Sequence, residues 1–166
     1  MDAFEIERAQ APHRQASALM EFIPLDTNIL VYVVDSAAPD KHRKARRIID
    51  VALGLDCVLT LQALCEFYFA VTRKGKLAPA AAREQVQAWQ SLFPVIAAKP
   101  ATLVRALQAA ESRAIAFWDA MLWATAREAG VTVLLSEDFH DGQVIEGVRI
   151  VNPFTVKDIG RLLGKN

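Results

Sequence analysis

The chain has 166 residues, of which 53% are hydrophobic, which suffices for one full hydrophobic core and is too short to hold two domains comfortably. Its 19 basic and 19 acidic side chains give a formal net charge of zero, so no overall field favours a polyanionic partner. No apolar run approaches the roughly 20 residues of a membrane span, and no basic stretch with an apolar signal core opens the chain. We therefore expect a cytoplasmic protein with no membrane segment.

Residues 1–19 are polar and mixed, and Pro12 would break a continuous helix there. We expect them to form an N-terminal extension, as a mobile arm or an extended start, outside a single folded domain at residues 20–166. Met20 stands directly before the first strong strand pattern and is a candidate for the natural start.

From residue 22 onward, short apolar runs alternate with longer helical patterns, which is typical of parallel strands joined by helical crossovers. Strands are expected at residues 22–26, 57–60, 94–97, 131–135 and 148–151. Helices are expected at residues 28–34, 41–53, 62–73, 79–91, 100–112, 118–129 and 155–163. Pro79 and Pro100 stand at helix starts, and Gly54, Gly75 and Gly130 mark helix ends. The pattern predicts an α/β fold around a parallel sheet of about five strands.

Cys57 and Cys65 both lie in apolar surroundings, so we expect two buried, reduced thiols rather than a disulfide or a metal pair. The basic residues gather in two groups. The first is Lys41, Arg43, Lys44, Arg46 and Arg47, and the second is Arg73, Lys74 and Lys76. Either group is a solvated helix face or a contact for a phosphate backbone.

Three acidic residues interrupt apolar segments. They are Asp26 after residues 22–25, Glu66 within residues 61–69 and Asp119 within residues 115–123. Burying an ionised carboxylate without a partner costs several kcal/mol, so such groups usually pair with a cation or bind a metal. A metal site is therefore the leading hypothesis.

The predicted topology brings a fourth acid to the other three. Asp26 ends its strand, and the strand at 131–135 runs into a loop that contains Asp138, so both lie at the carboxyl edge of the sheet. Asp119 is in the first turn of the helix before that strand, and Glu66 is one turn into the helix after the strand at 57–60. All four carboxylates can therefore meet at one edge.

Each acid also has a purely structural interpretation. Asp26 and Asp119 could cap helices through backbone N–H groups, Glu66 could lie on a solvated helix face, and Asp138 could be an ordinary loop acid. These alternatives remain open at the level of the single residue.

Two carboxylates about 4 Å apart repel by about 4 kcal/mol at an effective dielectric constant near 20, so a cluster of four needs cations. All-oxygen ligation favours Mg²⁺ or Mn²⁺ over zinc, and His42 and His140 are isolated residues expected at the surface. Few protein ligands leave coordination positions open for water and a phosphate oxygen, which suits hydrolysis of a phosphodiester.

Four motifs then carry a resemblance that runs from about residue 22 to residue 154. They are Leu25-Asp26-Thr27-Asn28-Ile29-Leu30, Gln62-Ala63-Leu64-Cys65-Glu66-Phe67, Phe117-Trp118-Asp119-Ala120 and Leu135-Ser136-Glu137-Asp138-Phe139. In this order the chain resembles the PIN-domain ribonucleases, and specifically VapC-like toxins of type II toxin–antitoxin systems. The resemblance implies a three-layer α/β/α sandwich, a Mg²⁺- or Mn²⁺-dependent endoribonuclease acting on RNA, and a homodimer inhibited by an antitoxin protein.

The resemblance also assigns roles to residues. Asp26 and Asp119 would be the principal metal ligands, and Glu66 and Asp138 would complete the acidic pocket and orient the attacking water. The supporting polar groups would be Thr27, Asn28 and Ser136, while Glu137 would be peripheral.

Two rival functions remain alternatives to this one. A haloacid-dehalogenase-like phosphatase would usually carry a second aspartate two residues after Asp26, where this chain has Asn28. A non-catalytic RNA-binding module would keep the fold without the chemistry, yet all four acidic positions are filled.

Overall fold

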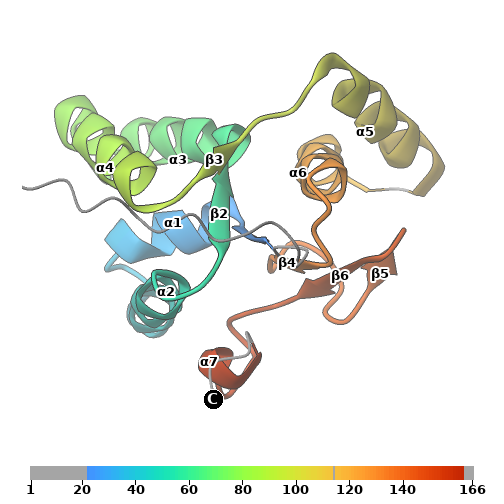
Figure 1. Ribbon diagram of the computed structural model, residues 1–166. Helices are drawn as coiled ribbons and strands as arrows, with labels where there is room; N and C mark the ends of the chain where they lie inside the picture. The colour runs from blue at the N-terminus through green and yellow to red at the C-terminus, as the bar shows by residue number, and fades with distance from the viewer. Residues whose placement is uncertain (1–21, 114, 163–166) are drawn as a thin grey trace, which may run out of the picture.

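A computed structural model describes residues 22–113 and 115–162, and the expected extension at 1–19 lies outside the described residues. A six-stranded sheet forms the centre, in the order β3-β2-β1-β4-β6-β5 (Figure 1). The strands are β1 (Ile23–Leu25), β2 (Cys57–Thr60), β3 (Val95–Ile96), β4 (Val133–Leu135), β5 (Val144–Ile145) and β6 (Val148–Val151). All neighbours pair in parallel except β5, which is antiparallel to β6.

The five predicted strands are present, and the sixth, β5, was not predicted. It pairs over only two residues and joins β6 through a turn at Glu146 and Gly147, whose φ angles are 46° and 87°. A strand of two residues is too short to show alternation, so no pattern in the sequence distinguishes it from a loop.

Seven helices connect and flank the strands in the described part of the chain. They are α1 (Thr27–Val34), α2 (Pro39–Ala52), α3 (Leu61–Arg73), α4 (Pro79–Leu92), α5 (Pro100–Arg113), α6 (Phe117–Glu128) and α7 (Ile159–Leu162). Proline opens α2, α4 and α5, where its missing N–H is not needed. The last helix is shorter within the described residues than the predicted 155–163, because it begins at Ile159.

The sheet separates two hydrophobic clusters, which makes the fold a three-layer α/β/α sandwich. Neighbouring residues of β4 belong to different clusters, Leu135 to the one with α1–α4 and α7, and Leu134 to the one with α5 and α6. Side chains alternate across a strand, so these two clusters lie on opposite faces. Among the described residues, no helix is long and apolar enough to cross a bilayer.

The prediction of buried cysteines is confirmed for Cys57 and wrong for Cys65, and both thiols are free. Cys57 is in a central strand, whereas α3 buries Ala63, Leu64 and Phe67 and turns Cys65 outward. Almost every residue at 61–71 is apolar, so the sequence did not show which face of this helix would be buried.

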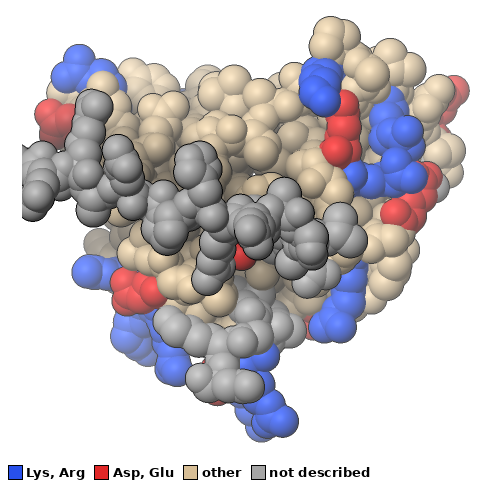
Figure 2. All heavy atoms as spheres, in the orientation of Figure 1, with Lys and Arg blue, Asp and Glu red and all other residues tan. Residues whose placement is uncertain are grey.

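The first basic group lies on the outer surface of α2. Lys41 is half-buried there, and the other four side chains are exposed: Arg43, Lys44, Arg46 and Arg47. Figure 2 shows basic side chains over α2 and around α5. Lys44 donates to the Phe154 carbonyl and Arg43 pairs with Asp40, which favours the solvated-face interpretation for this group.

Candidate functional site

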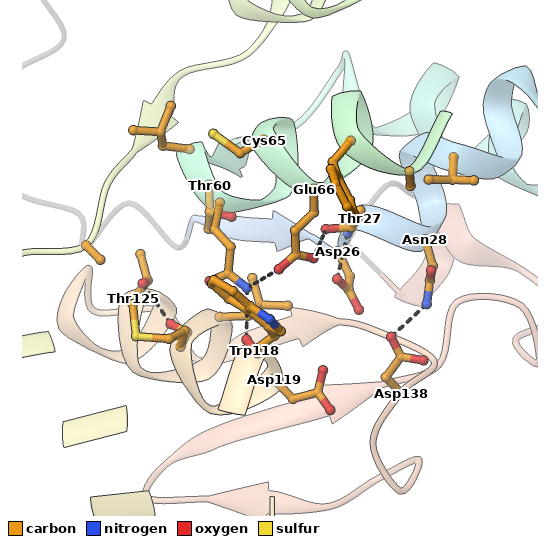
Figure 3. Close-up of a pocket in the computed structure, with 18 of the residues that line it drawn as sticks. Asp26, Thr27, Asn28, Thr60, Cys65, Glu66, Trp118, Asp119, Thr125 and Asp138 are labelled. Atoms are coloured by element: carbon orange, nitrogen blue, oxygen red, sulfur yellow. Dashed lines mark hydrogen bonds between the residues drawn. The ribbon is translucent and has the colours of Figure 1, made fainter. Parts of the chain in front are cut away.

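Four acidic side chains line one cavity of about 870 Å³. They come from separate segments: Asp26 after β1, Glu66 on α3, Asp119 on α6 and Asp138 after β4 (Figure 3). The cavity lies at the carboxyl edge of the parallel strands, because α1 and α3 begin directly after β1 and β2. The structure therefore brings together all four acids that the sequence singled out.

Asp26 is both a helix cap and the most deeply buried acid of the site. Its Oδ1 accepts from the Thr27 N–H at 2.6 Å, which caps α1, and its Oδ2 accepts from the Ser136 hydroxyl at 2.5 Å. Burial raises the pKa of this carboxyl group to about 7, against the lowering effect of the Ser136 hydrogen bond, and the Asp138 carboxylate adds to the rise. The capping interpretation holds for Asp26, but it accounts for only one of its two oxygens.

Asp119 lies in the first turn of α6 without capping it. The cap position is Ala116, and no side chain fills it, so the capping alternative for Asp119 is excluded. Burial raises the pKa of the Asp119 carboxyl group to about 6, and the nearby Asp138 and Glu66 carboxylates raise it further. None of the described residues that line the cavity donates a hydrogen bond to the Asp119 carboxylate, which faces the other carboxylates (Figure 3).

Glu66 is held by two neutral donors. The Thr27 hydroxyl donates to Oε2 at 2.9 Å, and the Gln62 amide donates to Oε1 at 2.8 Å. The same Gln62 nitrogen donates to the Trp118 carbonyl at 2.9 Å and so links α3 to α6. Sequence reasoning missed this role of Gln62, although its spacing of four residues from Glu66 on one helix face was a usable signal.

Asp138 lies at the exposed rim of the cavity. The Asn28 amide donates to its Oδ2 at 2.7 Å, and its own backbone N–H donates to the Ser136 hydroxyl at 3.1 Å. Partial burial and the Glu137 carboxylate raise its pKa. Each of the polar residues expected beside the acids, Thr27, Asn28 and Ser136, thus donates to one of them.

Glu137 lies outside the cavity lining, in line with the peripheral place given to it. It pairs with Lys41 at 2.7 Å, and Lys41 also donates to the Tyr32 hydroxyl at 2.9 Å. His42 contacts the Tyr32 carbonyl and His140 is exposed, and neither lines the cavity. These two histidines, the ones in the described part of the chain, therefore play no part in the acidic cluster.

The donor set of the cavity fits a hydrated Mg²⁺ or Mn²⁺ ion. Lys74 is the one basic residue that lines the cavity in the described part of the chain, so no ion pair within the lining neutralises the acids. Among the described residues, no group of three or more Asp, Glu, His or Cys side chains is placed to hold a metal ion directly. Mg²⁺ is commonly held by one or two carboxylates and several waters, so an open, all-oxygen arrangement suits it better than zinc.

The arrangement described above defines an α/β domain with an acidic cavity at the carboxyl edge of its sheet. Residues 23–140 match the PIN domain family, so the chain belongs to this family. No curated protein sequence matches the chain.

Solved structures with a similar fold include three bacterial proteins. The first is VapC20 of Mycobacterium tuberculosis, described as a sarcin–ricin loop cleaving toxin, with 18% identity and a TM-score of 0.59 over 76% of this chain and 98% of that chain. The second is DNA-bound VapBC of Salmonella typhimurium, with 19% identity and a TM-score of 0.59 over 79% of this chain and 97% of that chain. The third is FitAcB of Neisseria gonorrhoeae, with 18% identity and a TM-score of 0.54 over 81% of this chain and 99% of that chain. At these identities the likeness concerns the fold. The chain spans nearly the whole length of each of these proteins.

Proposed function

We propose that this protein is a metal-dependent endoribonuclease that acts as the toxin of a toxin–antitoxin pair. The observation that carries the proposal is the meeting of four carboxylates from four segments in one cavity of a PIN domain. Because the chain belongs to the PIN domain family, the haloacid-dehalogenase-like phosphatase is no longer a candidate function. A non-catalytic RNA-binding module is what a failed cleavage assay would support.

In this proposal Asp26 and Asp119 hold a Mg²⁺ or Mn²⁺ ion, which when bound supplies water activation and neutralises charge at the phosphate. Glu66 orients the attacking water, because each of its oxygens keeps a lone pair after accepting from Thr27 and Gln62. Asp138, fixed by Asn28, completes the pocket at its rim. Ser136 holds Asp26 and the Asp138 backbone in register.

One exposed surface and one comparison support protein partners. The α5 helix presents Leu103, Val104 and Leu107 with exposed fractions of 43%, 55% and 50%, which is an apolar face that a second copy or an antitoxin would cover. The antitoxin is proposed because a further solved structure of similar fold is a toxin–antitoxin complex from Klebsiella pneumoniae. A toxin that cleaves cellular RNA would act in the cytoplasm.

Cleavage of purified total RNA tests the proposal. We expect fragments with Mg²⁺ or Mn²⁺, none with a chelator, and none from Asp119→Asn, which keeps the side-chain volume and removes the charge. Asp50→Asn is the matched control, because Asp50 is an exposed acid of α2 that does not line the cavity. Equal cutting by Asp119→Asn and wild type would refute the assignment of the site, and absence of metal-dependent fragments from any RNA would refute the nuclease.

A further inference from the structure

Two large aromatic side chains are exposed beside the acids. Trp118 directly precedes Asp119 and is 58% exposed, and Phe69 follows Glu66 by three residues on α3 and is 59% exposed. Both line the same cavity as the four carboxylates, and Figure 3 shows Trp118 next to Glu66 and Asp119. The other tryptophans, Trp89 and Trp123, are 2% and 1% exposed, so this exposure is particular to Trp118.

Contacts hold both rings in place at the cavity. The Trp118 carbonyl accepts from the Gln62 amide that also holds Glu66, and the Trp118 indole packs edge-on against Phe117 at 5.1 Å between ring centroids. The Arg73 guanidinium lies over the Phe69 ring at 5.4 Å from its centroid. A fixed aromatic surface loses little conformational freedom when a flat ligand stacks on it.

The charges of the cavity argue that its ligand is held by more than its phosphates. Most affinity for a nucleic acid backbone comes from Lys and Arg, yet Lys74 is the one basic residue lining the cavity in the described chain. The basic side chains of α2 lie outside the lining. Stacking on aromatic rings is the other main source of affinity for single strands, and it tolerates any base.

We propose that Trp118 and Phe69 form a stacking site for unpaired nucleobases next to the scissile phosphate, and that these two side chains position the nucleoside at the cleaved bond. The inference rests on the proposed function, because the acids and both rings line one cavity, so a phosphate bound at the acids has its own nucleoside in the cavity that the rings line. Bases in a duplex stack on each other and offer no free face, whereas splayed bases of loops do. Trp118 and Phe69 are positioning residues, because they touch the base and not the reacting atoms.

Binding is measured with Ca²⁺ in place of Mg²⁺ to suppress cleavage. The fluorescence of Trp118 reports contact with the ring, and the fluorescence anisotropy of a dye-labelled RNA gives Kd for the wild type and for every variant. The probes are an unpaired RNA decamer and the same decamer annealed to its complement. We expect the decamer to quench the wild-type fluorescence and the duplex to leave it unchanged. Trp118→Phe should lose the quench and keep the affinity, and the substitutions Trp118→Ala and Phe69→Ala should each raise Kd about tenfold.

Tyr68→Ala is the matched control for Phe69→Ala. Tyr68 is an adjacent aromatic of α3, 41% exposed, and it does not line the acidic cavity. We expect its Kd to equal that of wild type. Equal Kd values for Trp118→Ala, Phe69→Ala and wild type would overturn the proposal, as would equal quenching by decamer and duplex. If the variants instead left Kd unchanged and altered only the oligomeric state of the protein in solution, the proposal would be wrong and the rings would belong to a protein interface.

Cleavage kinetics separate this inference from the proposed function. With Mg²⁺, Trp118→Ala should raise KM about tenfold and change kcat less than about twofold, and Trp118→Phe should restore KM. An abasic nucleotide beside the cleaved bond should raise the wild-type KM to that of Trp118→Ala and leave the variant unaffected. A wild-type protein that binds and is quenched but never cleaves would refute the nuclease and keep the stacking site, whereas cleavage with unaltered KM in Trp118→Ala would refute the stacking site alone.

Discussion

At the scale of single residues, Asp26 combines two roles that the sequence presented as alternatives. One oxygen caps α1 and the other is held by Ser136, so the carboxyl group has a fixed orientation before any ligand arrives. The same burial that fixes it disfavours its charge and raises its pKa to about 7. The ionised Asp26 carboxylate thus destabilises the metal-free folded protein, and a bound cation would offset its charge.

Asp26→Asn should stabilise the metal-free protein at pH 8. The folded-state pKa of about 7 lies above the ordinary 3.8, so the folded protein binds the extra proton. Stability is then greatest below pH 3.8 and is lost as the pH rises through about 7. The asparagine amide can accept from Thr27 and donate to Ser136, so both hydrogen bonds can be kept. The free energy of unfolding of the variant should therefore exceed that of the wild type by about 1–3 kcal/mol at pH 8. The variant should also lose much of this pH dependence, because the titrating group is gone.

Urea denaturation with a chelator at pH 5 and pH 8 measures this effect. Asp50→Asn serves as the control, because Asp50 is exposed and should leave both values within about 0.5 kcal/mol. Asp26→Asn that is less stable than wild type at pH 8 would show that the cap and not the buried charge dominates at this position.

Ser136→Ala should weaken metal binding without removing a proposed ligand. The buried Ser136 hydroxyl donates to Asp26 and accepts from the Asp138 backbone, so its loss frees both acids to move and raises the pKa of Asp26 further. Loss of such a supporting hydrogen bond typically lowers metal affinity by about 10–100-fold. Calorimetric titration with Mn²⁺ checks this, with Ser91→Ala on the exposed surface of α4 as the control. Unchanged affinity would mean that Ser136 serves packing alone.

At the scale of elements, the site depends on helices meeting at one edge of the sheet. Gln62 is the side chain that joins two of them, because its amide nitrogen reaches both Glu66 within α3 and the Trp118 carbonyl at the start of α6. Its amide oxygen is buried without a partner among the described residues. A buried polar atom left unpaired costs about 1–3 kcal/mol, so this position sacrifices stability to hold the two helices in register.

Gln62→Leu should therefore lower activity more than stability. The leucine removes the unpaired oxygen together with the bridge, so the free energy of unfolding should change by less than about 1 kcal/mol. Glu66 loses one of its two donors, and kcat should fall about tenfold. Single-turnover cleavage and urea denaturation measure the two quantities. Gln87→Leu on α4 is the control, because Gln87 does not line the acidic cavity. A fall in stability with no fall in kcat would contradict the bridging role.

At the scale of the whole molecule, chain order alone predicted where the acids meet. Parallel strands end at one edge, so Asp26 after β1 and Asp138 after β4 had to be neighbours once β1 and β4 paired. The exposure of Cys65 and Trp118 could not be predicted, because their segments are apolar on every side and periodicity then fails to distinguish faces. The Gln62 bridge depends on how α6 lies against α3, which is a tertiary property.

Metal binding should stabilise the whole domain, because only the folded chain assembles the four acids. An ion at 100 times its Kd adds about 2.7 kcal/mol, which corresponds to a rise in Tm of about 5–10 °C for a protein of this size. The rise should be larger at pH 8 than at pH 6, since carboxyl groups with pKa values of about 7 and about 6 must lose their protons to bind it. Thermal scans with and without Mn²⁺ test this on wild type, Asp119→Asn and Asp50→Asn. The rise should vanish in Asp119→Asn and persist in Asp50→Asn, and a rise of equal size in both would place the ion away from the acidic cavity.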